Sequence, residues 1–122
     1  EVTVPPVAPQ ETTRLVAGGF LAADGHPAVV LSLAALTKGA VLKPGKVGAI
    51  LVPDEEPVTR AFNEQGLILF PLEVAASVAA GNTGYAASGQ PRFLLGFPRY
   101  RVLYYNTSDR SITVNLSAYL TN

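Results

Sequence analysis

Apolar residues occupy every second position of residues 112 to 120, near the end of the chain, and a polar residue or a tyrosine separates each pair. A period of two is typical of a β-strand that buries one face and leaves the other in water. A second segment, rich in apolar and aromatic residues, covers residues 92 to 105, and the polar residues 106 to 109 lie between the two segments. The pattern predicts a C-terminal hairpin over about residues 92 to 120.

A turn sequence in the middle of the chain, Lys43-Pro44-Gly45-Lys46, lies between β-branched, apolar segments at residues 40 to 43 and 46 to 52. Proline fixes φ at about −65° and glycine tolerates a positive φ, as a type II turn requires. Residues 28 to 33 and 66 to 70 have the composition of further strands. Because a two-stranded ribbon cannot bury its own face, other strands must cover it. The predicted fold class is mainly β, a small barrel-like or sandwich-like domain.

One short helix is predicted at residues 71 to 80. Pro71 suits the first position of a helix, Glu73 carries a negative charge in the first turn, and Gly81 suits the end. The alanine-rich sequence between them favours a helix that lays one apolar face on the sheet.

The first residues of the chain contain Pro5, Pro6 and Pro9 among valines and polar residues. This composition predicts an extended arm over residues 1 to 14, ahead of a single domain over residues 15 to 122. Val2 and Val4 flank a polar residue, so the arm has the pattern of a strand that adds to the sheet edge of another protein.

Charge and composition narrow the classes of partner. The chain has 122 residues, enough for one domain, and its 9 basic and 9 acidic residues give a formal net charge of zero. Nucleic-acid binding and membrane-surface binding both favour a basic excess, so neither is expected. No signal peptide and no apolar stretch of about 18 residues is apparent. A neutral chain lacks the repulsion that keeps copies apart, which favours an oligomer.

The absence of cysteine excludes a disulfide and a sulfur metal site, while the absence of methionine and tryptophan and the 10 prolines suit a thermostable protein. His26 is the only histidine, and with Asp24 it offers a general base. No motif places a nucleophile beside it, so a hydrolase is the weakest hypothesis and a solvated turn residue is favoured. The acidic residues Asp54, Glu55 and Glu56 lie between two prolines without the spacing of a metal or glycosidase site, which favours a solvated loop. We therefore expect no enzyme, no metal, no cofactor and no small-molecule substrate.

Arginines alternate with aromatic residues between residues 92 and 105. Such a surface can stack the bases of a single-stranded nucleic acid, but the neutral charge favours amphipathic strands or a protein interface. The candidate subunit-interface residues are Phe97, Arg99, Tyr100, Arg101, Tyr104 and Tyr105.

The order of three segments resembles the lambda-type head decoration proteins of tailed bacteriophages. These segments are the arm, the sequence LTKGAVLKPGKVGAILV, and FNEQGLILFPLEVAAS, in which Leu69-Phe70-Pro71 ends a strand and opens a short helix. The resemblance covers about residues 1 to 85. Residues 90 to 122 depart from it, because the short members of the family do not have a hairpin there.

The resemblance implies a structural cement protein on the outer surface of an expanded capsid in the virion. It implies three copies around a local threefold axis, an arm that joins a strand of the major capsid protein, and, given the composition, a thermophilic host. The capsid-binding arm residues are then Val2, Thr3, Val4, Pro5, Pro6 and Val7. The alternative is a β-sandwich module of a tail fibre or adhesin that binds carbohydrate or a receptor.

Overall fold

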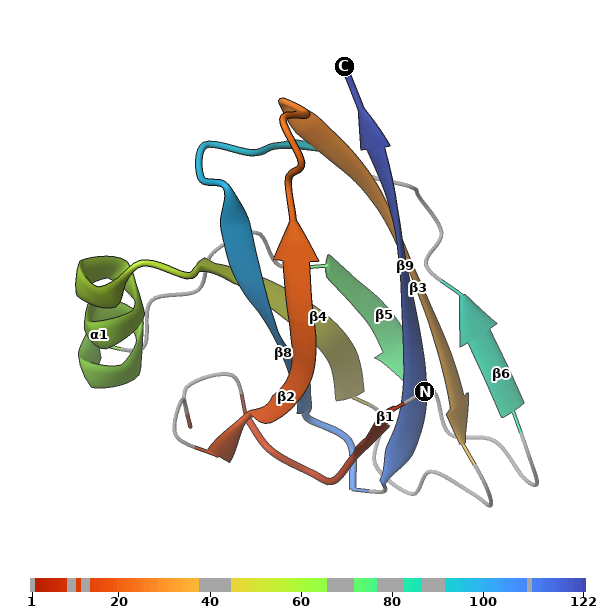
Figure 1. Cartoon of the computed structure of the whole chain (residues 1–122). Coiled ribbons are helices and arrows are strands. Elements are labelled where there is room, and N and C mark those ends of the chain that lie inside the picture. The colour runs from red at the N-terminus through yellow and green to blue at the C-terminus, as the bar shows by residue number, and fades with distance from the viewer. Residues whose placement is uncertain are drawn as a thin grey trace.

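The computed structural model describes residues 2 to 8, 11, 14 to 37, 45 to 65, 72 to 76, 83 to 86, 92 to 109 and 111 to 122. Over these residues the chain forms two antiparallel sheets and one helix (Figure 1). The expected fold class, a mainly β, sandwich-like domain with one short helix, is confirmed, and the sheets do not close into a barrel.

The five-stranded sheet is built around its two longest strands, β3 (Ala28–Thr37) and β9 (Ile112–Thr121). They pair over their whole length, from Ala28 opposite Thr121 to Thr37 opposite Ile112. The remaining strands of this sheet are β1 (Val2–Val4), which pairs with β9, and β6 (Thr83–Ala86) and β7 (Arg92–Leu94), which both pair with β3.

The four-stranded sheet has the order β2 (Val16–Ala22), β8 (Arg99–Asn106), β4 (Gly45–Pro53) and β5 (Leu72–Ala76). Its two central strands are continuous apolar runs instead of alternating ones. Consecutive residues Ile50, Leu51 and Val52 of β4 are all almost completely buried, which requires cover on both faces of the strand. Gly48 lies opposite Tyr105 in this sheet, and a Cβ atom there would overlap the tyrosine ring, so glycine allows the ring to pack on the backbone.

The core lies between the sheets and contains valine, leucine and isoleucine side chains from β1, β3, β4 and β9 together with the aromatic residues of β8. The helix α1 (Glu56–Gln65) follows β4 directly and packs against it, on the side of the four-stranded sheet away from β3 and β9 (Figure 1). Phe62 is the buried anchor of the helix, with 1% of its surface exposed.

Three predicted strands are confirmed. Residues 28 to 33 lie in β3, residues 46 to 52 lie in β4, and the alternating residues 112 to 120 lie in β9. The predicted strands at residues 40 to 43 and 66 to 70 lie outside the described residues, as do Lys43 and Pro44 of the predicted type II turn.

The predicted position of the helix is wrong. Residues 72 to 76 form β5, which pairs with β4 from Gly45 opposite Ala76 to Ala49 opposite Leu72, and the rest of the predicted helix lies outside the described residues. A ten-residue alanine-rich segment is a marginal helix in water, and the edge of β4 offers it a ladder of backbone hydrogen bonds. The helix forms instead where an acidic loop was expected. Glu56 and Pro57 open α1, and only Asp54 and Glu55 remain as an exposed bend.

The predicted C-terminal hairpin is also wrong. β8 pairs with β2 and β4, whereas β9 pairs with β1 and β3, so the two strands belong to different sheets. The chain therefore crosses from one sheet to the other between Asn106 and Ile112. Both faces of β8 are mainly apolar, so other parts of the protein must cover both of them, whereas β9 alternates and buries only one face. The two patterns therefore suit different places in a sandwich.

The arm is part of the domain in this structure. β1 pairs with β9 in the register Val2 opposite Val114 and Val4 opposite Ile112, and Val7 forms a bridge with Asn106 through backbone hydrogen bonds of 2.8 and 2.9 Å. Val4 is 0% exposed and Val7 is 4% exposed. The described arm residues thus complete the sheet and core of their own chain.

A buried asparagine fixes this arrangement. The Asn106 Nδ2 group donates to the Val4 carbonyl at 3.0 Å, and its Oδ1 atom accepts from the Ser108 backbone N–H at 2.9 Å and from the Ser108 hydroxyl at 2.6 Å. Because a buried amide without partners costs stability, these bonds select the conformation in which β1, the end of β8 and the crossover meet.

We predict that Val4→Ala lowers the free energy of unfolding by about 2 kcal/mol, because it removes two buried methyl groups and leaves a cavity. Urea unfolding followed by circular dichroism measures the change. Thr3→Ala is the matched control on the exposed side of the same strand and should change stability by less than about 0.5 kcal/mol. Equal, small effects of both substitutions would show that the arm is free in solution.

Candidate interaction surface

The outer face of the five-stranded sheet is formed by alternate residues of β3 and β9. Val29, Leu31 and Leu33 of β3 point into the core, so Val30 and Ser32 lie on the opposite face. The register places Val30 opposite Tyr119 and Ser32 opposite Ser117.

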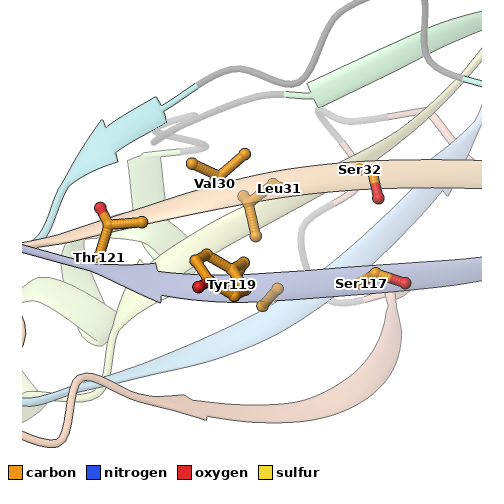
Figure 2. A pocket seen from close by; sticks show the side chains of 7 residues that line it. Val30, Leu31, Ser32, Ser117, Tyr119 and Thr121 are labelled. Carbon is orange, nitrogen blue, oxygen red and sulfur yellow. The ribbon is translucent and has the colours of Figure 1, made fainter.

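These residues line a shallow, open hollow of about 440 Å³ (Figure 2). Figure 2 shows Val30 and Ser32 on β3 beside Tyr119 and Ser117 on β9, with Thr121 at the end of the strand. The residues that line the hollow carry no charge, so its chemistry consists of one aromatic ring, aliphatic groups and hydroxyls.

Two large side chains stand exposed at this end of the sheet. Tyr119 is 73% exposed and Leu94, which lies opposite Ala28 at the end of β7, is 67% exposed. Beside them the Arg92 guanidinium donates to the Asn122 carbonyl oxygen at 3.0 Å and lies 3.5 Å from the Thr121 hydroxyl. The face therefore combines exposed apolar area with hydroxyl groups and one cation at its margin.

A second surface cluster lies on the other sheet. The Arg99 guanidinium stacks 3.8 Å above the ring of Phe20, which is 56% exposed, and its Nε atom lies 3.4 Å from an Asp54 carboxylate oxygen. Arg99 and Asp54 neutralise each other at the surface, so this cluster presents an aromatic ring with little net charge.

The predicted capsid-binding residues are divided between the core and the surface. Val4 and Val7 lie in the core, Val2 is half-buried, and Thr3, Pro5 and Pro6 are exposed. A strand already paired with β9 can join another protein only through its free edge or by leaving its own sheet.

The predicted subunit-interface residues are divided in the same way. Tyr100, Tyr104 and Tyr105 are between 0% and 4% exposed, so they pack inside the domain. Phe97 and Arg101 are half-buried and only Arg99 is exposed. The reason is the position of β8 in the middle of its sheet, where both faces of the strand are covered. The aromatic residues between 92 and 105 are thus mainly core residues.

The residues weighed for catalysis lie apart from the hollow. His26 follows the turn Asp24-Gly25, in which both residues have positive φ, and its Nδ1 atom lies 3.2 Å from the Ala23 carbonyl oxygen. The Glu56 carboxylate pairs with Arg60 at 2.9 Å on α1. Over the described ranges, no group of three or more His, Cys, Asp or Glu residues is arranged to hold a metal ion. In that same part of the chain, no helix is both long and apolar enough to cross a bilayer.

Sequence reasoning did not single out the hollow. The signal was present in β9, where Tyr119 is a large aromatic residue at a position of the alternating pattern that faces outward. Leu94, Val30 and Ser32 join it only through the pairing of β3 with β7 and β9, which local sequence does not specify. Comparison with models of protein families, with curated proteins and with solved structures gave no match.

Among the described residues, Tyr104 is a buried group whose ionisation is linked to stability. Burial raises the pKa of Tyr104 above the usual value of 10.0, because the phenolate would lose its hydration. The folded protein therefore holds this proton more tightly than the unfolded chain. Stability linked to Tyr104 is fully present below the unfolded pKa and is lost as the pH rises through the higher, folded pKa.

We predict that, above about pH 10, Tyr104 contributes a decrease in unfolding free energy of up to about 1.4 kcal/mol per pH unit. Urea unfolding at several alkaline pH values measures the slope. Tyr104→Phe should remove this contribution, and Tyr119→Phe, at an exposed position, should leave it. The explanation fails if Tyr104→Phe retains the full slope.

Proposed function

We propose that this chain is a non-enzymatic structural protein that binds the outside of an expanded phage capsid and stabilises it. The single observation that carries the proposal is the outer face of the five-stranded sheet, where Tyr119 and Leu94 are exposed on a rigid support beside an uncharged hollow. Exposed aromatic and aliphatic residues on a face without opposed charges are what a protein contact buries. The identity of the partner as a capsid rests on the resemblance in the order of the sequence segments.

The contact with the capsid would form mainly through the outer face of the five-stranded sheet. The backbone of the paired strands is already ordered, so binding costs mainly the freedom of the two proteins and of the exposed side chains, and burial of Tyr119 and Leu94 offsets part of that cost. Repetition over many equivalent capsid sites then adds to the stabilisation of the shell. Three copies around a threefold axis, as the resemblance implies, are part of this proposal.

The arm also has a role within its own domain. Its apolar residues Val4 and Val7 are core residues of the domain, so removal of residues 1 to 14 is expected to unfold the protein. Exposed Thr3, Pro5 and Pro6 remain free to contact the major capsid protein from the edge of the sheet.

We predict that the purified protein co-sediments with expanded capsids of its source phage at about one copy per capsid subunit, and not with unexpanded capsids. Tyr119→Ala combined with Leu94→Ala should weaken binding at least about tenfold, because it removes the exposed apolar groups of the face. Phe20→Ala, which removes an exposed aromatic ring from the other sheet, is the matched control and should bind normally. Absence of binding to both forms of capsid would reject the proposal.

A carbohydrate-binding adhesion module is the second candidate. The observation that favours it is the tyrosine ring beside the hydroxyls of Ser32, Ser117 and Thr121, because sugars stack on aromatic rings and exchange hydrogen bonds with hydroxyls. In this case a glycan array should retain the protein, and Tyr119→Ala should lose the signal while Phe20→Ala keeps it. Retention of glycans by both variants would place the sugar site elsewhere.

A further inference from the structure

Among the residues that the structure describes, most of one edge of β9 has no partner strand. On one side β9 pairs with β3 along its whole length, whereas on the other side β1 covers only Ile112 to Val114. Within the described part of the chain, no strand pairs with residues 115 to 121 on that side. In Figure 1, β1 lies beside the lower end of β9, and the upper part of β9 extends beyond it towards the C-terminus.

Side-chain exposure agrees with an open edge. Ala118 lies between Leu116 and Leu120 on the face that points towards the core, yet it is exposed. Tyr119, on the outer face, is 73% exposed. The edge is therefore accessible from both faces of the sheet.

The open edge also lacks the features that keep sheet edges from pairing. Proteins protect such edges with charged residues, prolines, bulges or short strands. Residues 115 to 121, with the sequence NLSAYLT, contain no charge and no proline, and their pairing with β3 is regular. A strand of this kind is suited to receive another strand.

We propose that two copies of this chain pair antiparallel through the open edges of β9, around a twofold axis at Ala118. The register follows from using the whole edge while keeping each face of the sheet continuous. It places Asn115 opposite Thr121 of the second copy, Leu116 opposite Leu120, Ser117 opposite Tyr119, and Ala118 opposite itself.

The side chains fit this register on both faces. On the core side, Leu116 packs against Leu120 of the second copy, which joins apolar groups that are only half-buried in one chain. On the outer side, Tyr119 lies beside Ser117 of the second copy, a small residue that leaves room for the ring. Each Tyr119 then covers part of the hollow of the other copy.

Charge favours a second copy over another occupant. Self-pairing about a twofold axis brings identical surfaces together, so any charge on the edge would face its own like charge. Residues 115 to 121 have none, and the Arg92 guanidinium that contacts Thr121 lies at the end of the edge, away from the axis at Ala118, so like charges do not meet at the axis. A single pair of strands is a small interface, and we expect dissociation in the range of about 10 to 100 µM.

This inference does not depend on the proposed capsid function. The pairing is a property of the purified protein in solution, whereas the capsid proposal, with its three copies around a threefold axis, concerns the protein bound to a shell. Tyr119 takes part in both contacts. A dimer that fails to bind capsids would reject only the capsid proposal, and a monomer that binds them would reject only this inference.

The first test is sedimentation equilibrium of the purified chain at concentrations up to about 500 µM, several times the expected dissociation constant. We expect reversible dimers. Ala118→Lys should raise the dimer dissociation constant at least about tenfold, because two like charges would meet at the axis. Ala17→Lys is the matched control, because it adds the same charge at an exposed alanine of β2 in the other sheet. The inference would be overturned if the chain were a monomer at all concentrations or formed a trimer. It would also be overturned if Ala118→Lys and Ala17→Lys lost dimer formation equally.

The second test fixes the register and uses the absence of cysteine from the chain. Ala118→Cys should form a disulfide-linked dimer under mild oxidation, because paired residues on adjacent strands have Cα atoms about 5 Å apart. Asn115→Cys alone should not, because the two copies of residue 115 lie about 20 Å apart in this register. Adding Thr121→Cys to Asn115→Cys should restore cross-linking. Equal cross-linking of the two single variants would overturn the register.

Discussion

The pairing of β3 with β9 over ten residues is the contact on which the rest of this structure depends. It joins a segment from the first third of the chain to the last, and its inner residues supply much of one wall of the core. β1, β6 and β7 are all short strands that attach to one member of this pair. Short strands are marginal by themselves, so they exist because the long central pair gives them an edge to bind.

The two ends of the chain stabilise one another through this pair. β1 adds to β9, Val4 and Val7 enter the core, and Asn106 bonds the Val4 carbonyl from the end of β8. A buried asparagine whose amide nitrogen and oxygen are both hydrogen-bonded tolerates few alternative arrangements, so it specifies where the N-terminal strand lies and where the chain crosses between sheets. This turns an arm that looks detachable in the sequence into a structural part of the domain.

The same pair also creates the surfaces that remain available. Its outer face carries Tyr119 and an uncharged hollow, and the edge of β9 beyond Val114 is open in the part of the chain that the structure describes. The face offers side chains and the edge offers backbone N–H and C=O groups, and Tyr119 belongs to both surfaces. The surface chemistry is thus concentrated at the end of β9, and the aromatic residues of β8, which look like an interface in the sequence, are occupied in the core.

The sequence by itself determined where several strands lie, because period-two alternation in residues 112 to 120 and β-branched runs at 28 to 33 and 46 to 52 are local signals. It also determined the fold class and the neutral character of the surface. Tertiary structure decided the rest. The edge of β4 made a strand of residues 72 to 76, which have helical composition, and burial of Phe62 accompanies a helix that begins at Glu56, within the acidic segment that was expected to be a loop. The partners of β8 and β9, the place of the arm and the open edge all depend on contacts between residues far apart in the chain, and local pattern carries no information about which strands meet.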